Sequence, residues 1–264
     1  MTTCQIGILG AMGRMGQAIA ATISATEGAT IGGAADRPTH DMVGKPYPFA
    51  DVTLGGSIED LFRSSDVVID FTPPGSTAHH AGIAAQTGKP LIVGTTGLKA
   101  ADHAALDDAA ASTVIVQAGN FSLGVNLLTA LTQKAASILG DDWDIEILEM
   151  HHRNKVDAPS GTAEMLGEAA ASGRQVNLED VACRSREGII GARPSGEIGF
   201  ATLRGGSVIG EHEVVFASDS ERITLSHRAE NRGLFAGGAV RAAVWAQGKP
   251  AGRYTMLDVL GLDL

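Results

Sequence analysis

The chain has 264 residues, a formal net charge of −10, 44% hydrophobic and 4% aromatic residues, and 34 glycines. This length suits one large domain or two small ones, and the apolar share is enough to bury a sizeable core. The net negative charge argues against a general nucleic-acid-binding protein, because phosphate contacts need a basic face.

Short apolar runs alternate with alanine-rich helical stretches from Gln5 to about Ser137. This alternation predicts an α/β fold in which a Rossmann-type, doubly wound parallel sheet has helices between its strands. The predicted strands are 5–10, 29–36, 66–71, 90–94 and 113–117. The predicted helices are 12–24, a short helix that begins with a capping-box pattern at Ser57, 77–86 and 98–110.

The second half has a different texture, which begins near 120–126. It predicts an α+β domain with a mainly antiparallel or mixed sheet, one side of which faces solvent or a partner. Ser160 is expected to be the N-cap of its helix, and Gly173 the C-cap. The predicted elements are strands at 144–150, 197–205, 207–218 and 221–230, and helices at 160–172 and 231–247.

A glycine-rich turn follows the first predicted strand and opens the first helix, with glycines at positions 10, 13 and 16. Such a turn brings backbone N–H groups and a helix N-terminus to a pyrophosphate. Asp36 stands 20 residues after Gly16 (36 − 16), where a carboxylate can bind the hydroxyls of the adenosine ribose. Arg37 comes next and can hold a 2′-phosphate, so the pattern allows both NAD and NADP.

Three further loops follow predicted strand ends, where ligands bind in open α/β sheets. They are Phe71–Pro74, Gly94–Gly97 and 118–121. Taken singly, each of the first two is better explained as a plain turn. Together the three loops form a candidate site for the nicotinamide.

The most distinctive stretch is EMHHRNKVDAPSGT, 149–162. His151, His152, Arg153 and Lys155 precede a helix start at 160–162, and a helix N-terminus attracts anions. This set predicts a site for a small substrate that carries carboxylates, beside a histidine able to donate a proton. A metal site is a poor alternative, because the arginine and the lysine would repel a cation.

Other candidate residues have plainer explanations. His79 and His80 on a predicted helix are expected to be surface residues. Arg232 is a candidate anion contact or, equally, a surface arginine. Cys4 and Cys183 lack a disulfide or metal spacing, which fits a reducing cytosol. The N-terminus lacks a secretory signal and no apolar run is long enough for a membrane span, so a cytoplasmic protein is expected.

These motifs together resemble the dihydrodipicolinate reductase family, also called 4-hydroxy-tetrahydrodipicolinate reductase, of the diaminopimelate and lysine pathway. The resemblance extends over essentially the whole chain. The 149–162 stretch carries it most specifically. The supporting motifs are GAMGRMG (10–16), FTPP (71–74), GTTG (94–97), NFSLGVN (120–126) and FAGGAVRAAVW (235–245).

The resemblance implies an enzyme that uses NADH or NADPH to reduce a cyclic dicarboxylate with loss of water. His151 would be the proton donor and Lys155 a second donor or an electrostatic partner, and the substrate carboxylates would bind at His152, Gly161 and Thr162. The implied cofactor residues are Gly10, Ala11, Met12, Gly13, Arg14, Met15, Asp36, Arg37, Gly94, Thr95, Thr96, Ala118, Gly119, Asn120 and Phe121.

The resemblance also implies a domain plan and a homotetramer formed through the sheet of the second domain. A dinucleotide-binding domain would span 1–122 and be completed by 233–264, and a substrate-binding and oligomerisation domain would span 123–232. Two rival functions remain: a different NAD(P)-dependent dehydrogenase of the same plan, and a non-catalytic NADPH sensor. A sensor would have little need for the pair His151 and Lys155.

Overall fold

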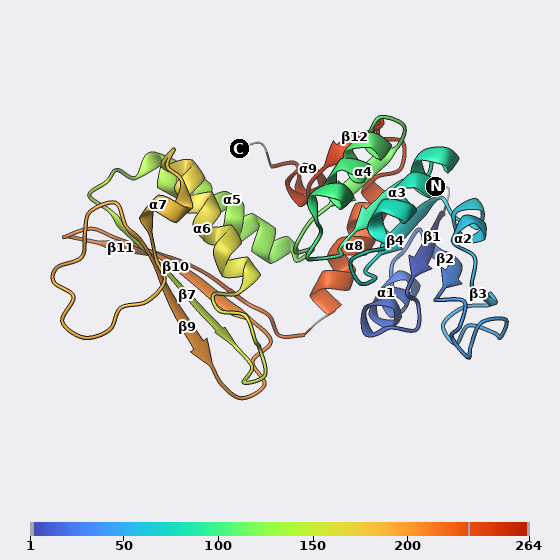
Figure 1. Ribbon diagram of the computed structural model, residues 1–264, viewed down its shortest axis with the longest axis horizontal. Helices are drawn as coiled ribbons and strands as arrows, with labels where there is room; N and C mark the ends of the chain where they lie inside the picture. Colours follow the sequence, from blue (N-terminus) through green and yellow to red (C-terminus); the bar gives the residue numbers. More distant parts are fainter. Residues whose placement is uncertain (1–2, 232, 263–264) are drawn as a thin grey trace. The chain divides into compact units, whose positions relative to one another are not determined.

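The computed structural model describes residues 3–231 and 233–262 (Figure 1). They form two compact units. The first contains the N-terminal residues up to 122 and a C-terminal segment, 233–261. The second is built from the residues between these two segments.

The first unit contains a seven-stranded sheet whose strands all run parallel. The strand order is β12-β6-β5-β4-β1-β2-β3, so β2 and β3 lie on one side of β1 and the other four strands lie on the other side. This arrangement confirms the predicted doubly wound sheet. The strands are β1 (Cys4–Leu9), β2 (Ala29–Ala35), β3 (Leu54–Gly55), β4 (Val67–Asp70), β5 (Leu91–Val93), β6 (Val114–Gln117) and β12 (Gly252–Tyr254).

Helices cover both faces of this sheet (Figure 1). The pair α1 and α8 pack against each other, and α3 packs against both α2 and α4. The helices are α1 (Arg14–Ser24), α2 (Ile58–Ser64), α3 (Thr77–Thr87), α4 (Ala100–Ala110), α8 (Gly233–Trp245) and α9 (Met256–Leu260).

The inner strands are buried on both faces, which explains why their sequences are continuous apolar runs rather than alternating ones. All four residues of β4 are buried, and so are all three of β5.

Two other elements show what local sequence does and does not reveal. The helix α2 begins after Ser57, whose side chain accepts the Asp60 N–H at 3.2 Å, as the capping-box pattern predicts. The strand β12 is only three residues long and half-buried. Its sequence therefore lacks the pattern that marks the other strands.

The second unit has a five-stranded mixed sheet, in the order β11-β10-β7-β9-β8. The pairs β7–β9 and β9–β8 are parallel and the other two are antiparallel. The predicted mixed sheet is thus confirmed. Its strands are β7 (Asp144–His151), β8 (Ala182–Cys183), β9 (Ile198–Arg204), β10 (Glu211–Ala217) and β11 (Arg222–Arg228), and its helices are α5 (Leu123–Ile138), α6 (Gly161–Gly173) and α7 (Leu178–Val181).

The two faces of this sheet differ. On the inner face, Ile147, Val214 and Phe216 are buried in a core with Leu128 of α5 and Leu166 of α6. Because successive residues of a strand point to opposite faces, the neighbouring positions form an outer face. We define the outer face by the apolar side chains Leu148, Met150, Leu203 and Val215, of which Leu203 is 46% exposed.

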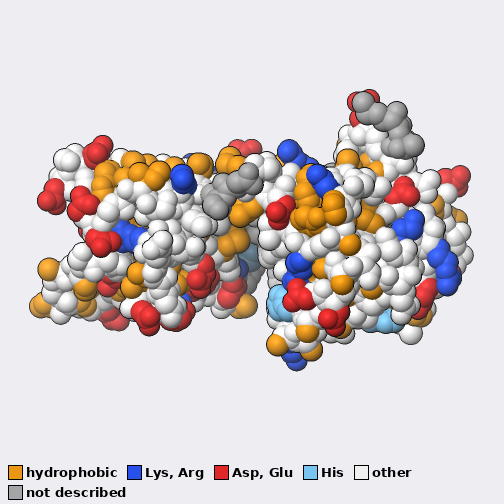
Figure 2. All heavy atoms as spheres, turned by 90° about the horizontal axis from the view of Figure 1, so that it is seen from above, with side chains coloured by type: hydrophobic (Ala, Val, Ile, Leu, Met, Phe, Trp, Pro, Cys, Tyr) orange, Lys and Arg blue, Asp and Glu red, His pale blue; other side chains and the backbone are white. Residues whose placement is uncertain are grey.

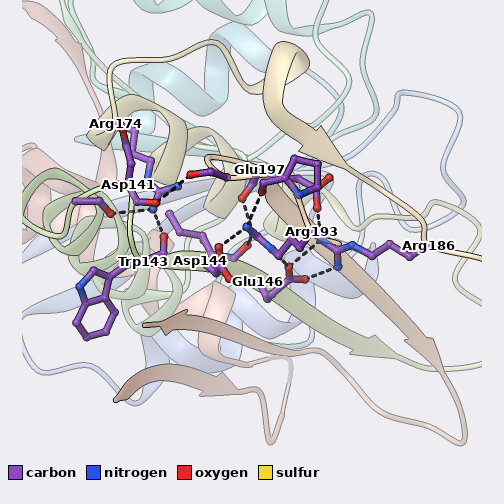
Figure 3. A network of polar contacts seen from close by, with 12 residues as sticks. Asp141, Trp143, Asp144, Glu146, Arg174, Arg186, Arg193 and Glu197 are labelled. Atoms are coloured by element: carbon purple, nitrogen blue, oxygen red, sulfur yellow. Dashed lines mark hydrogen bonds and ion pairs between the residues drawn. The ribbon is translucent and has the colours of Figure 1, made fainter. Parts of the chain in front are cut away.

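The loop between β8 and β9 is tied down by a charged network (Figure 3). The Glu146 carboxylate accepts two bonds of 2.8 Å from Arg186 and one of 2.9 Å from Arg193. Arg193 also reaches Asp144 at 2.6 Å, and Arg186 pairs with Glu197. Burial acts to raise the pKa of Glu146, but the two guanidinium groups outweigh it and hold that pKa low.

The prediction that Gly173 is the C-cap of α6 is wrong. Gly173 is the last residue of α6, and Arg174 caps the helix in a right-handed conformation. Glycine is required there because α6 lies close to α5. A Cβ on residue 173 would lie 2.4 Å from the carbonyl oxygen of Gln133.

Among residues 3–231 and 233–262, no helix combines the length and apolar character of a membrane span. The surface carries charges of both signs. Figure 2 shows acidic side chains scattered over the face in view, with Lys and Arg side chains between them.

Candidate active site

The glycine-rich turn has the geometry that a phosphate site needs. Gly10 has a φ of +63°, and its carbonyl accepts the Gly13 N–H at 2.9 Å. Gly16 allows the helix to pass close to the turn, since a Cβ there would lie 2.4 Å from the carbonyl oxygen of Gly10. Gly13 is the N-cap of α1 and has no side chain to cap the first-turn N–H groups. These donors are available to an anion.

A pocket of about 770 Å³ opens at the carboxyl ends of β1, β2 and β4. Of the predicted cofactor residues, five line it, while Ala11 is fully buried and Arg14 and Met15 lie outside the lining. Its lining includes Gly10, Met12, Gly13, Asp36, Arg37, Phe71, Thr72, Pro73, Ser76, His79 and His80.

Asp36 is held by hydrogen bonds to the backbone, whereas the Arg37 side chain is exposed. One oxygen of the Asp36 carboxylate accepts the Met12 N–H at 3.0 Å, and the other accepts the Arg37 N–H at 2.9 Å. The carboxylate is thereby held at the edge of the glycine-rich turn. The Arg37 side chain is exposed and makes no ion pair with any described residue.

The expectation of two surface histidines is wrong for His80. His79 is exposed, but His80 is 2% exposed and its Nδ1 lies 2.7 Å from Oδ2 of Asp70. Asp70 is fully buried at the end of β4, and its other oxygen accepts two bonds from Thr72. Burial acts to raise the pKa of Asp70, but the contacts with His80 and Thr72 outweigh it and lower that pKa. The sequence signal for this pair is Asp70 itself, because a carboxylate at the end of a buried apolar strand needs a polar partner.

The predicted nicotinamide loops are joined mainly through buried side chains. Thr95 is 3% exposed and donates its hydroxyl to the Thr72 carbonyl at 3.0 Å. A Cβ on Gly94 would lie 2.2 Å from the Phe71 ring, which in turn packs against Phe121 at 5.5 Å. These side chains therefore support the loops, and the Gly94 and Ala118 N–H groups donate to the carbonyls of Asp70 and Val93. Thr96 and Gly119 are exposed, and Ala118 and Asn120 are half-buried.

In the second unit, Glu149 organises the residues predicted to carry the chemistry. It is 1% exposed, and its Oε2 lies 2.6 Å from Nδ1 of His151. Arg204 of β9 binds both carboxylate oxygens, at 2.7 and 2.9 Å. The Ser160 N–H donates to Oε1 at 3.0 Å. One carboxylate thus joins two strands to the start of α6.

The electrostatics of this group follow from burial and pairing. Burial acts to raise the pKa of Glu149, but the hydrogen bonds from Arg204 and His151 outweigh it and keep the carboxylate ionised. Burial lowers the pKa of His151, and its bond to Glu149 offsets this only in part. Since Glu149 accepts the Nδ1 hydrogen, Nε2 is the nitrogen left for exchange with a ligand.

The remaining predicted residues surround this pair. Lys155 is bound to Asp157 at 2.8 Å, with the lysine side chain 20% exposed. His152 is half-buried and Gly161 is exposed at the start of α6. Thr162 lies in the first turn of that helix. Cationic side chains and the N-terminal turn of α6 therefore lie near His151, which suits a carboxylated ligand.

Sequence reasoning missed Arg204 and His212. Both lie on the inner face of the sheet, as do Glu149 and His151, because their positions alternate in phase with the core residues. The strand pattern predicted that face, but not which strands are neighbours. The predicted anion contact Arg232 lies outside the described residues.

Two family models match nearly the whole chain. "Dihydrodipicolinate reductase, N-terminus" matches residues 4–121, and "Dihydrodipicolinate reductase, C-terminus" matches residues 124–260. A 4-hydroxy-tetrahydrodipicolinate reductase of Ruegeria pomeroyi is 52% identical over 263 residues, which cover 97% of this chain and 98% of that protein. One from Rhodopseudomonas palustris is 48% identical over 268 residues, covering 99% of both.

Solved structures share the fold. A dipicolinate-bound dihydrodipicolinate reductase from Paenisporosarcina sp. TG-14 is similar with a TM-score of 0.80 and 24% identity, covering 97% of this chain and 99% of that one. A diaminopimelate dehydrogenase of C. glutamicum is similar with a TM-score of 0.57 and 13% identity, covering 98% and 94%.

Proposed function

We propose that this chain, which belongs to the dihydrodipicolinate reductase family, reduces 4-hydroxy-tetrahydrodipicolinate to tetrahydrodipicolinate with loss of water. The reaction is a step of diaminopimelate and lysine biosynthesis, and it uses a nicotinamide cofactor. The observation that supports it most directly is the Glu149–His151 pair, held by Arg204 beside an anion-attracting helix start.

The first unit suits the cofactor in shape and chemistry. The glycines allow the turn and α1 to pack closely together, and the 770 Å³ pocket runs from Gly10 and Gly13 to Asp36 and Arg37. The glycine-rich turn of 10–15 would bind the pyrophosphate through the N–H groups of the first turn of α1, and Asp36 would bind the ribose hydroxyls. Arg37, which has no ion pair among the described residues, would bind the 2′-phosphate of NADPH, so we infer that both cofactors are used.

The nicotinamide end would be held by the backbone of Gly94–Thr96 and of 118–121. When bound, the reduced nicotinamide supplies the hydride. The buried side chains of Thr95 and Phe121, which hold these loops in position, support this assignment.

His151 would supply the proton. Glu149 fixes its Nδ1–H and stabilises the imidazolium, so Nε2 carries the proton that is donated. The substrate carboxylates would bind His152, Gly161, Thr162 and the N–H groups that open α6. Lys155 would add a second positive charge or a second proton. Bound carboxylates raise the proton affinity of His151, so the donor is charged when substrate is present.

We propose roles for the two units on the same grounds. Residues 1–122 with 233–264 bind the cofactor, and 123–232 bind the substrate and associate into a homotetramer. The outer face offers the apolar surface for that association. We also propose that the protein is located in the cytoplasm, where reducing conditions keep cysteines such as Cys4 and Cys183 free.

The test is oxidation of the reduced cofactor, followed by absorbance, with substrate generated from pyruvate and aspartate semialdehyde by the preceding synthase. Oxidation that requires the complete mixture, with NADH and with NADPH, is expected. Folded protein that binds NADH but oxidises it only with other carboxylated substrates would favour a different dehydrogenase of the same plan. Binding without any turnover would favour the sensor.

A further inference from the structure

A second histidine lies behind the proposed proton donor. His212 of β10 is 5% exposed, on the same inner face as Glu149 and His151. Its ring meets the His151 ring edge-on, with 5.1 Å between the centroids. Its Nε2 lies 3.1 Å from the Ser160 hydroxyl, which caps α6. None of the roles proposed above uses this residue.

His212 is neutral at physiological pH. Burial, with a further contribution from His151, lowers its pKa to about 4. A neutral imidazole carries one N–H, either on Nδ1 or on Nε2. Its Nδ1 is shielded from solvent and has no hydrogen-bond partner among the described residues.

The surroundings select one tautomer. With the hydrogen on Nδ1, a buried N–H would have no acceptor, and orphaned N–H groups are rare in folded proteins. With the hydrogen on Nε2, His212 donates to the Ser160 oxygen. That oxygen already accepts the Ala163 N–H at 3.2 Å. Two donors then occupy the oxygen, and the Ser160 hydroxyl hydrogen needs an acceptor of its own.

The described residues around Ser160 do not supply that acceptor. The contacts of the Ser160 hydroxyl within the described residues are those to His212 and Ala163. The neighbouring Glu149 oxygen is bonded to the Ser160 N–H instead. A ligand carboxylate at the start of α6 would be the missing acceptor.

We propose that His212 is a positioning residue, which turns the Ser160 hydroxyl into an obligatory donor for a substrate carboxylate and supports the edge of the His151 ring. The inference rests on the proposed function, because it takes the start of α6 to be the carboxylate site. It extends that function to a residue 52 positions from Ser160 in the sequence.

The test compares two replacements of similar size. Gln places an amide N–H as many bonds from Cα as His Nε2, so His212→Gln keeps the donor, whereas His212→Met removes it. Dipicolinate serves as the probe for the carboxylate site, and its Kd is measured by calorimetry in the presence of NADH. The KM for substrate, kcat and the Kd for NADH are measured alongside.

We expect His212→Met to raise the dipicolinate Kd and the substrate KM about fivefold, because the neutral hydrogen bond that holds the Ser160 hydroxyl in its donor orientation is lost. The Kd for NADH should change less than about twofold, and His212→Gln should restore most of the loss. Val214→Ala is the matched control: Val214 is a fully buried core residue on the same strand and face. It should lower the Tm and leave the dipicolinate Kd unchanged.

A second arm tests the route through Ser160. In a Ser160→Ala background, His212→Met should add little to the loss of dipicolinate binding, because the pair acts as one unit. Independent, additive losses would overturn the inference, and so would a His212→Met protein that binds dipicolinate like the wild type. If the wild type binds dipicolinate but never oxidises cofactor, the proposed function fails while the positioning role is still decided by the binding data.

Discussion

Asp70 in the first unit and Glu149 in the second are single buried carboxylates, and each holds the polar residues around it in place. Each carboxylate is almost fully buried, and each holds a histidine, at 2.7 and 2.6 Å. A buried charge is tolerated only when it is paired and hydrogen-bonded. Asp70 meets this condition through Thr72, and Glu149 through Arg204. Both pairs hold a histidine at the candidate site of its own unit while keeping the carboxylate itself out of solvent.

The free energy of unfolding should fall as the pH is lowered, because the pKa of His212 is lower in the folded chain than in the unfolded chain. His212 titrates near 4 in the folded chain against 6.5 in the unfolded chain, so the unfolded state binds the extra proton between these values. By pH 5 this costs about 2 kcal/mol of unfolding free energy. The lowered pKa values of Asp70 and Glu149 act in the same direction at still lower pH.

The check is denaturant unfolding of the wild type and His212→Gln from pH 7 to pH 5. The glutamine variant does not titrate at this position, so its stability should vary less over this range. Equal slopes for the two proteins would show that His212 is not a buried neutral histidine.

Arg37 should decide how well NADPH binds. Its exposed guanidinium has no ion pair among the described residues to lose, so Arg37→Ala should leave the fold intact. The loss of a charged contact with the 2′-phosphate should raise the Kd for NADPH about tenfold or more. The Kd for NADH should stay within about twofold. Arg63→Ala, which removes an exposed i,i+3 ion pair with Asp60 within α2, is the control. Equal effects on both cofactors would remove Arg37 from the phosphate site.

The limits of sequence reasoning at this scale are physical. His151, Lys155 and the Ser160 cap are close in sequence, so their spacing reveals them. Arg204 and His212 lie 55 and 52 residues from the partners they bind. Their role depends on strand order, which a single sequence does not encode locally. His80 was misjudged because its partner, Asp70, had been read only as part of a strand.

At the scale of elements, Gly173 should prove essential to the packing of α5 against α6. Gly173→Ala would bring a methyl group within 2.4 Å of the Gln133 carbonyl and 2.8 Å of the Ala136 Cβ. Such overpacking costs about 1–3 kcal/mol, which thermal unfolding would detect. Gly82→Ala in α3 is the matched control, since its Cβ meets open space and should stabilise the chain by about 0.5 kcal/mol. Equal Tm values for both variants would contradict the packing argument.

Element prediction succeeded where the pattern was long and regular. The apolar runs of β1, β4 and β5 and the Ser57 and Ser160 caps followed from local rules. It failed at β12 and at the end of α6. The strand β12 is short and half-buried and is held by pairing with β6. The glycine that ends α6 is needed because the neighbouring helix α5 leaves no room for a Cβ, and a local pattern does not reveal that contact.

At the scale of the whole molecule, the alternation of strand and helix was enough to predict a doubly wound sheet followed by a mixed sheet. The number of subunits is a separate matter. We propose that copies meet through the outer face, where Leu203 is 46% exposed. Leu203→Glu should then convert a tetramer into smaller species in light scattering coupled to gel filtration. Glu168→Gln, on an exposed position of α6, is the control. A wild type that is monomeric at working concentration would contradict this.

The central claim is that the cofactor is bound by one set of residues and that His151 of another set donates the proton. The most direct test measures kcat and the Kd for NADH together in His151→Ala. We predict a fall in kcat of about 100-fold or more, the usual contribution of a general acid, with the Kd changed less than about twofold. A variant that turns over like the wild type would contradict the assignment, and so would a loss of activity that follows entirely from weaker NADH binding.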